Sequence, residues 1–266
     1  MTTYVISDIH GCYDEFLCML ARISLNSEDK LILAGDYIDR GRQSLEMLRW
    51  LEKKPNNVLP IKGNHDAEFI ENIRIMREID TEEELMTDPE SSEDAKALYE
   101  SVKYMLKQKS GAAAKYYDYY GTIKMLIDQN GVCFQELCRW ADMMKVYPFF
   151  YRFPMNGRDC IVVHAGFCEA EEAVKDEYSD IVEFYLYARD DSIRIGGVKH
   201  GMIISGHTPT IAKDTAFYSE GKVFRYHDEE KDCIFYNIDC GCAYHEAYSS
   251  GTMSCIHLED EKVLYL

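Results

Sequence analysis

The sequence contains no run of about 18 consecutive apolar residues, the length that an ordinary transmembrane helix needs. We therefore expect no membrane span. The first residues, Met1 to Val5, also lack the basic region and the long apolar run of a secretory signal, so we expect a cytoplasmic protein. Internal repeats and low-complexity tracts are missing as well, so nothing in the sequence indicates a repeat architecture.

Basic residues are scarce in this chain. Lys and Arg number 29 against 47 Asp and Glu, which gives a net charge of −18. Sequence-independent binding to DNA or RNA relies on Lys and Arg to neutralise phosphates, so such binding is not expected. Docking on an anionic membrane surface is disfavoured for the same reason. We expect neither a nucleic acid nor a membrane as a partner.

The ten cysteines contain no pair of Cys-x-x-Cys units, so the usual pattern of a structural zinc site is absent. Only Cys240 and Cys242 lie close together in the sequence. Disulfides are typical of small secreted chains, whereas this chain has 266 residues and no recognisable signal. We expect the cysteines to be reduced thiols. Those within apolar runs are expected in the core, and they are Cys12, Cys18, Cys160 and Cys255.

Apolar residues make up 47% of the chain, enough for a well-buried core, and in the first third their spacing alternates between strand and helix. Short apolar runs predict strands at residues 4–7, 31–34 and 58–61. Helical spacing predicts helices at residues 14–23 and 44–54, the second beginning at a serine, a residue type that caps helix N-termini. This order is typical of βαβ units, in which helices pack on a parallel sheet.

The middle of the chain departs from this alternation. Residues 81–94 carry seven acidic and no basic side chains, so we expect a solvated loop there, with a charged lid as the alternative. The whole chain, residues 1–266, is expected to form a single domain into which residues 67–146 are inserted as a mainly helical block. Apolar residues at helical spacing predict its helices, at residues 69–79, 95–109 and 134–144.

Strand character returns in the last third of the chain. Apolar runs predict strands at residues 160–163, 202–205 and 233–238. Residues 253–258 and 263–266 predict a closing hairpin.

Five of the predicted strands are followed by a short segment in which Asp, Asn or His accompanies Gly. In parallel α/β sheets, functional groups collect beyond the carboxyl ends of the strands, and glycines let the backbone turn sharply there. The segments are Asp8-Ile9-His10-Gly11, Gly35-Asp36, Gly63-Asn64-His65-Asp66, His164-Ala165-Gly166 and Gly206-His207. We therefore expect one cluster of side chains, made of Asp8, His10, Asp36, Asn64, His164 and His207.

This cluster offers carboxylate and amide oxygens together with imidazole nitrogens, and it contains no thiolate. Such ligands suit manganese, iron or zinc better than calcium or a soft metal. Six ligands exceed the need of one tetrahedral ion, whereas a two-metal site with a bridging carboxylate uses them all. We expect two divalent ions, manganese first, with iron and zinc as alternatives. A lone histidine is more often structural, and that interpretation stands for His200, His227, His245 and His257.

The five segments, in this order from residue 8 to residue 208, resemble the signature of the phosphoprotein phosphatase family within the calcineurin-like metallophosphoesterases. The most specific is Gly35-Asp36-Tyr37-Ile38-Asp39-Arg40-Gly41, since the wider superfamily usually keeps only its Gly-Asp portion. Ser7, Asp66 and Ala165 depart from the eukaryotic members and are similar to the bacterial and phage branch. The resemblance implies an α/β fold, a four-layer α/β/β/α sandwich. The helical block is the part that it covers least.

The resemblance also implies roles for individual residues. One ion would be held by Asp8, His10 and Asp36, and the other by the bridging Asp36 with Asn64, His164 and His207. His65 would be the general acid, oriented and kept protonated by Asp39, while Arg40 would grip phosphate oxygens. The family has a second phosphate-binding arginine between its last two histidines, for which Arg189 is the best placement and Arg194 the alternative. The ions would provide a hydroxide that attacks phosphorus in line.

A metal-dependent phosphoesterase is thus implied, and we expect first a phosphatase acting on phosphorylated Ser or Thr in proteins. The alternative is a hydrolase of dinucleoside polyphosphates, such as diadenosine tetraphosphate, or of other small phosphorylated metabolites. A roofed site would favour small substrates, and the helical block could supply the roof. Its tyrosines would either stack on a nucleobase or pack in the core; they are Tyr99, Tyr104, Tyr116, Tyr117, Tyr119 and Tyr120.

Two other functions have less support. A non-catalytic metal-binding scaffold on the same fold would be indicated by the loss of catalytic or ligand residues, and none of them is lost. A nuclease or phosphodiesterase is opposed by the net charge and by the Asp39-Arg40-Gly41 extension. Asp239-Cys240-Gly241 also follows a predicted strand, and we expect it at the rim of the site without a ligand role.

Overall fold

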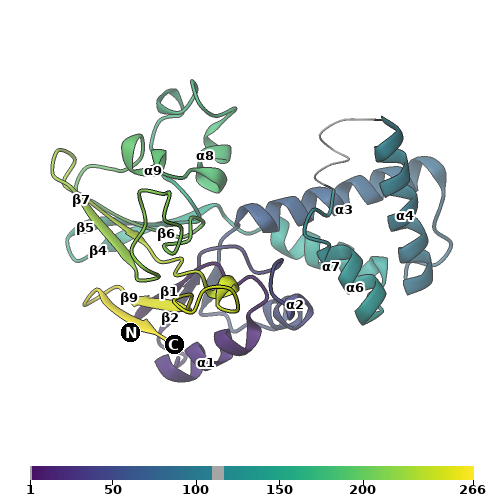
Figure 1. Ribbon diagram of the computed structural model, residues 1–266, viewed down its shortest axis with the longest axis horizontal. Helices are drawn as coiled ribbons and strands as arrows, with labels where there is room; N and C mark the ends of the chain where they lie inside the picture. Colours follow the sequence, from purple (N-terminus) through teal and green to yellow (C-terminus); the bar gives the residue numbers. More distant parts are fainter. Residues whose placement is uncertain (1, 110–116) are drawn as a thin grey trace.

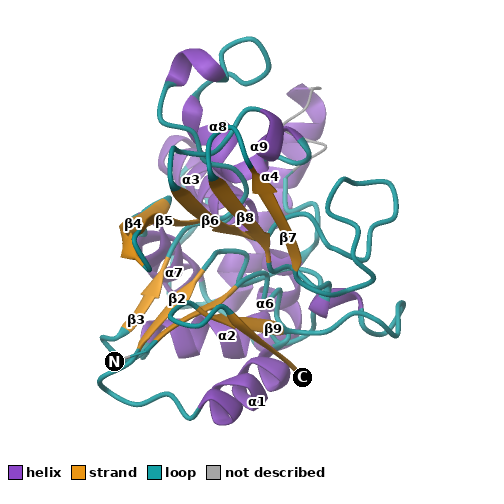
Figure 2. Cartoon of the chain, turned by 90° about the vertical axis from the view of Figure 1, so that its left-hand side faces the viewer, coloured by secondary structure: helices purple, strands orange, loops and turns teal. Residues whose placement is uncertain are grey.

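The computed structural model describes residues 2–109 and 117–266, in which two five-stranded sheets lie face to face. Figure 1 shows the sheets stacked between helices, with a group of further helices projecting to one side. Figure 2, turned by 90°, shows the strands of the two sheets one above the other. Tyr116, one of the tyrosines considered for base stacking, lies outside the described residues.

The first sheet has the strand order β10-β9-β1-β2-β3. β1 (Thr3–Ile6), β2 (Lys30–Leu33) and β3 (Val58–Pro60) are parallel, as the βαβ pattern predicts. The crossovers contain α1 (Tyr13–Ile23) and α2 (Ser44–Glu52). The predicted closing hairpin is confirmed as β9 (Ser254–His257) and β10 (Lys262–Tyr265), which pair antiparallel, and β9 adds to the edge of β1.

The second sheet has the order β4-β5-β6-β8-β7. Its parallel centre is β5 (Arg158–Val163), β6 (Gly201–Ser205) and β8 (Cys233–Asn237), all three predicted as strands. The edge strands β4 (Phe150–Met155) and β7 (Phe224–Asp228) pair antiparallel and were not predicted. The remaining elements are α8 (Ile181–Tyr187), α9 (Asp191–Arg194) and the 3₁₀ turns Glu171–Ala173 and Cys242–Tyr244.

Alternate side chains of the central strands bury opposite faces, which explains why these strands are apolar throughout. Val5 and Ile32 of the first sheet meet Val162 and Ile204 of the second in the core between the sheets. The outer face of the first sheet packs against α1, α2 and the projecting helices, and the outer face of the second against α8. The α/β fold with four layers, α/β/β/α, is therefore confirmed.

The described chain between β3 and β4 is mainly helical. It forms α3 (Asn64–Glu83), α4 (Ser92–Lys109), α6 (Thr122–Asn130) and α7 (Phe134–Lys145), the group that projects from the sandwich in Figure 1. We propose that this block is an insertion into a single domain. The acidic loop is shorter than predicted because α3 and α4 extend into it. Asp94 in the first turn of α4 accepts hydrogen bonds from the backbone of Thr87 and Asp88, and acidic residues are favoured there.

All ten cysteines lie in the described part of the chain and are free thiols. Cys12, Cys160 and Cys255 are buried as predicted, but Cys18 is exposed. It lies on the outer face of α1, whose buried face presents Phe16, Met19 and Ile23, so the prediction of a core thiol there was wrong. No helix among the described residues combines the length and the apolar character that a membrane span requires.

We expect Trp140→Ala to lower the free energy of unfolding by about 3–5 kcal/mol, because the side chain is fully buried in α7 and truncation leaves a cavity. Urea denaturation followed by circular dichroism measures this change. The matched control is Tyr104→Ala on α4, where the ring is 65% exposed and the expected change is within about 0.5 kcal/mol. Equal losses in the two variants would contradict the packing described above.

Candidate metal centre

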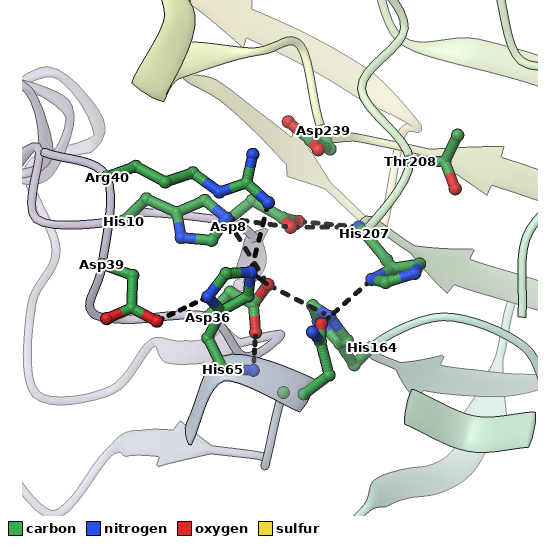
Figure 3. Close-up of polar contacts among 12 residues, drawn as sticks. Asp8, His10, Asp36, Asp39, Arg40, His65, His164, His207, Thr208 and Asp239 are labelled. Atoms are coloured by element: carbon green, nitrogen blue, oxygen red, sulfur yellow. Dashed lines mark hydrogen bonds and ion pairs between the residues drawn. The ribbon is translucent and has the colours of Figure 1, made fainter. Parts of the chain in front are cut away.

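Five strand ends bring their polar side chains to one place between the two sheets. Asp8 and His10 follow β1, Asp36 follows β2, and Asn64 begins α3 directly after β3. His164 follows β5 and His207 follows β6, so both sheets contribute. All six side chains predicted as metal ligands lie in the same cluster and are buried (Figure 3).

The Asp36 carboxylate lies at the centre of this cluster. Its Oδ2 atom is 3.4 Å from Nε2 of His10 and 3.4 Å from Nε2 of His164. Nε2 of His65 is 3.8 Å from the same oxygen. Two groups of side chains that could hold a metal ion share this carboxylate: His10, Asp36 and His65, and Asp36, His164 and His207.

Asn64 and Asp8 complete the cluster on either side of Asp36. The Oδ1 atom of Asn64 is 3.0 Å from Nε2 of His164 and 3.0 Å from Nδ1 of His207. Asp8 Oδ1 is 4.0 Å from Nε2 of His10, and both Asp8 oxygens accept the backbone N–H of His207, at 3.1 and 3.0 Å. The strand ends of the two sheets are thereby tied directly to each other.

The ring orientations of two histidines are fixed by backbone carbonyls. His10 donates from Nδ1 to the carbonyl of Ile38 at 2.8 Å, and His164 donates from Nδ1 to the carbonyl of Ala34 at 2.9 Å. A carbonyl only accepts, so Nδ1 carries a proton in both rings, and Nε2 is the ring atom that faces Asp36. Metal-binding histidines are usually held in this way. The donor set therefore fits divalent cations.

The pKa values of the cluster reflect the same concentration of acceptor groups. Burial alone would lower the pKa of His164, but the Asp36 carboxylate outweighs it and raises the pKa to about 10. Burial lowers the pKa of His10 to about 3 and raises the pKa of Asp8 to about 6. The negative charge of Asp36 thus favours the protonated form of His164, whereas burial disfavours the charged forms of His10 and Asp8.

The backbone at these strand ends adopts a conformation that non-glycine residues rarely use. Asp8, His10 and Asp36 have φ values of 50°, 47° and 57°, and His207 has 69°. Such left-handed φ values cost energy and persist only where the surrounding structure imposes them. Here they turn the ends of β1, β2 and β6 so that the side chains face the common centre.

Glycines allow two of the strand ends to approach the carboxylates closely. A Cβ atom on Gly63 would lie 2.2 Å from Oδ1 of Asp36, and one on Gly206 would lie 1.8 Å from Oδ2 of Asp8. The buried Asp66 carboxylate adds a further tie, because it accepts the backbone N–H groups of Asp36, Tyr37 and Gly63 at 2.8 to 3.1 Å. Asp66, for which no role was predicted, thus connects the loops after β2 and β3.

His65 lies beside the cluster and is held by Asp39. Its Nδ1 is 2.6 Å from Oδ2 of Asp39, as the predicted pairing requires. The other oxygen of Asp39 accepts a hydrogen bond from the hydroxyl of Thr122 at the start of α6. Burial alone would lower the pKa of His65, but the Asp36 and Asp39 carboxylates outweigh it and raise the pKa above its usual value. No pattern in the chain predicts this role of Thr122.

Arg40 reaches over the cluster toward His65 (Figure 3). Its Nη2 is 3.1 Å from Nε2 of His65, a contact in which Arg40 donates and the imidazole nitrogen is unprotonated. The guanidinium lies between two aromatic rings, with its carbon 5.3 Å from the ring centre of Tyr120 and 5.1 Å from that of Tyr244. The Tyr120 ring also packs on His65, at 4.6 Å between ring centres. Tyr120 therefore covers both groups.

The two arginines considered for a second phosphate contact differ in their surroundings. Arg194 is paired with Glu177, with 2.5 Å between Nη2 and Oε2. The exposed Arg189 guanidinium has no hydrogen bond or ion pair within the described chain. Burial lowers the pKa of His207 well below its usual value, and the positive charge of Arg189 acts in the same direction.

Asp239 lies at the margin of the cluster, as expected for a residue without a ligand role (Figure 3). It is buried after β8, and its Oδ1 accepts the backbone N–H of Gly241 at 2.9 Å. Burial and the negative charge of Asp8 raise its pKa well above the usual value.

The family model of calcineurin-like phosphoesterases matches residues 1–210 of this chain, which include every strand end of the cluster. The chain belongs to this family. The family is metal-dependent, in agreement with the donor set of the cluster, and the chain is therefore a phosphoesterase hydrolase.

Two curated relatives share a name, symmetrical bis(5'-nucleosyl)-tetraphosphatase. The protein of Actinobacillus pleuropneumoniae is 44% identical over 71 residues, which is 26% of each chain. The protein of Stutzerimonas stutzeri is 37% identical over 97 residues, which is 35% of each chain. The alignments thus span about a quarter to a third of these relatives. At this coverage, the relatives' substrate can be suggested for this phosphoesterase only as a proposal.

A solved structure described as that of "a putative diadenosine tetraphosphatase" is similar over the whole chain. The alignment covers 100% of this phosphoesterase and 92% of that chain, with a TM-score of 0.53 and 15% sequence identity. A metallophosphoesterase of Sphaerobacter thermophilus gives a TM-score of 0.50 at 11% identity, covering 86% of that chain. At these identities the two similarities support the fold alone.

We expect Gly206→Ala to weaken the binding of manganese to this phosphoesterase at least tenfold, because its Cβ atom would displace the Asp8 carboxylate. Isothermal titration calorimetry with manganese measures the affinity. Gly131→Ala is the control. It also replaces a glycine by alanine, here at a positive φ, but no atom lies within 4 Å of the new Cβ atom. Unchanged affinity in Gly206→Ala would contradict the importance of this close approach.

Proposed function

We propose that this phosphoesterase hydrolyses dinucleoside polyphosphates of the diadenosine tetraphosphate kind, using two divalent ions, manganese first. The name shared by its sequence relatives supports this substrate class. The geometric observation that supports the proposal is that the site is covered. Tyr120, from the helical block, packs on His65 and Arg40. A covered site suits a small, extended phosphate compound better than the surface of a folded protein.

The expectation of a Ser/Thr protein phosphatase has less support. The sequence relatives named above favour the alternative, a small nucleotide substrate. Tyr187 covers the other side of the cluster, with its ring centre 6.4 Å from that of His207 and its hydroxyl hydrogen-bonded to Glu68 of α3. The approach to the cluster is therefore bordered by tyrosines on both sides.

In this proposal one ion is held by Asp8, His10 and Asp36, and the other by Asp36 with Asn64, His164 and His207. When bound, the two ions would neutralise phosphate charge and lower the pKa of the attacking water. Asp36 suits the bridging position because three imidazole nitrogens face one of its oxygens.

His65 is proposed as the general acid. Its Nδ1 is held by Asp39, so Nε2 is the atom that delivers the proton to the leaving oxygen. Arg40 occupies Nε2 as a donor, and this contact and a proton on Nε2 exclude each other. We propose that Arg40 turns to phosphate oxygens when substrate binds, where a guanidinium binds in a bidentate manner, and that Nε2 then carries the proton.

The first test compares substrates and metal. We expect release of nucleotide from diadenosine tetraphosphate with manganese, loss of this activity after chelation, and little release of phosphate from a phosphoserine peptide. Asp36→Asn should reduce kcat at saturating manganese at least about 100-fold, because it weakens the proposed bridge. Cys18→Ser, an exposed change on α1, is the control and should retain wild-type activity. Faster hydrolysis of the peptide than of the dinucleotide would refute the proposed substrate class.

The second test concerns His65. We expect His65→Ala to lower kcat for diadenosine tetraphosphate by about 10²–10⁴-fold, because the leaving phosphate oxygen loses its proton donor. For phenyl phosphate the loss should be larger, since phenolate is a more basic leaving group than a nucleotide phosphate and depends more on receiving a proton. Steady-state kinetics on both substrates measure the difference. Equal losses on the two substrates would assign His65 a role other than general acid.

A further inference from the structure

A cavity of about 1050 Å³ opens next to the metal centre, and no role has been assigned to it above. One wall is the segment after β6, from Pro209 to Glu220, which begins two residues beyond His207. The other wall is the segment from Tyr244 to Ser250, after β8. Arg189 lines the same cavity. One wall of the cavity therefore closely follows the proposed metal ligand His207 in the chain.

Side chains in this cavity have the chemistry that a nucleotide requires. Tyr218 and Tyr248 line it with rings that are 39% and 55% exposed, and aromatic rings stack on nucleobases of any sequence. Arg189 and Lys213 place two positive charges in the lining, which also includes the carboxylates of Asp214 and Glu220. Cavities of roughly 300–1,000 Å³ hold ligands of nucleotide size.

Tyr244 connects this cavity to the reaction site. Its ring lines the cavity and also packs on the Arg40 guanidinium, at 5.1 Å. Arg40 in turn contacts His65. A chain of phosphates that starts at the metal centre can thus pass Arg40 and Arg189 before it reaches the tyrosines.

The tyrosines of the helical block are less suitable for holding a base. Tyr120 is packed on His65 and Arg40. The space beside Tyr119 and Tyr120 measures only about 10 Å³, and its lining includes the carboxylates of Asp39, Glu68 and Asp118. Such a space excludes a nucleobase by size.

We propose that the cavity between the segments after β6 and β8 binds one nucleoside end of the substrate. In this arrangement Tyr218 and Tyr248 stack on the base, while Arg189 and Lys213 bind the phosphates that link it to the metal centre. The proposal rests on the proposed function for the identity of the substrate. It adds the part of the site that distinguishes a dinucleotide from a simple phosphate ester.

The kinetic test uses the full chain with manganese and the double variant Tyr218→Ala/Tyr248→Ala. We expect the ratio of kcat/KM for diadenosine tetraphosphate to that for para-nitrophenyl phosphate to fall about tenfold or more. Tenfold corresponds to about 1.4 kcal/mol, which is within the contribution of one stacked base. The control is Tyr226→Ala on β7, where a tyrosine of similar exposure, 42%, lies outside the cavity lining. An unchanged ratio in the double variant overturns the proposal.

The binding test does not depend on hydrolysis. Calorimetry of the manganese-loaded protein with adenosine monophosphate and with tripolyphosphate separates the base from the phosphates. We expect the double tyrosine variant to lose more affinity for adenosine monophosphate than for tripolyphosphate, and Lys213→Ala to weaken both. If the wild-type protein binds adenosine monophosphate in this way but leaves diadenosine tetraphosphate intact, the proposed function fails and the nucleotide cavity stands. Equal affinity of wild type and double variant for adenosine monophosphate refutes the cavity.

Discussion

The Asp36 carboxylate and the imidazole nitrogens around it constitute the interaction on which the rest of the structure depends. Two Nε2 atoms face one oxygen at 3.4 Å, in a place from which water is largely excluded. Buried groups that accept hydrogen bonds repel one another unless positive charge lies between them. The cluster therefore favours cations or protons between its members, and the fold must hold these side chains together.

The backbone provides that restraint. The strand ends adopt left-handed φ values, and Gly63 and Gly206 let the chain pass within van der Waals contact of the carboxylates. Four of the five strand ends continue from a strand that has a hydrogen-bonded neighbour on each side, which resists displacement, while β3 lies at the edge of its sheet. Asp66 ties two of the loops through three backbone donors. Strain of this kind is tolerated where a well-packed core imposes it.

The sequence predicted the central strands and the composition of the cluster because both are local patterns. Apolar runs mark the buried strands, and the polar residues that follow them are adjacent in the chain. The two edge strands of the second sheet were not predicted because neither has the apolar run of a buried strand. β4 contains Arg152 and Pro154, and β7 is largely polar. The contacts of Thr122 with Asp39 and of Tyr120 with His65 join residues far apart in the chain, and no local pattern signals them.

These long-range contacts indicate that the helical block does more than cover the site. Thr122 binds one oxygen of Asp39 while His65 binds the other, so the start of α6 fixes the carboxylate that orients the imidazole. The same block provides Tyr120 as a wall for Arg40, opposite Tyr244 of the cavity. The proposed proton donor, the proposed phosphate-binding arginine and the proposed base cavity are thereby linked through two tyrosines. If these proposals hold, the choice of substrate depends on parts of the helical block and of the cavity that lie outside the proposed metal ligands.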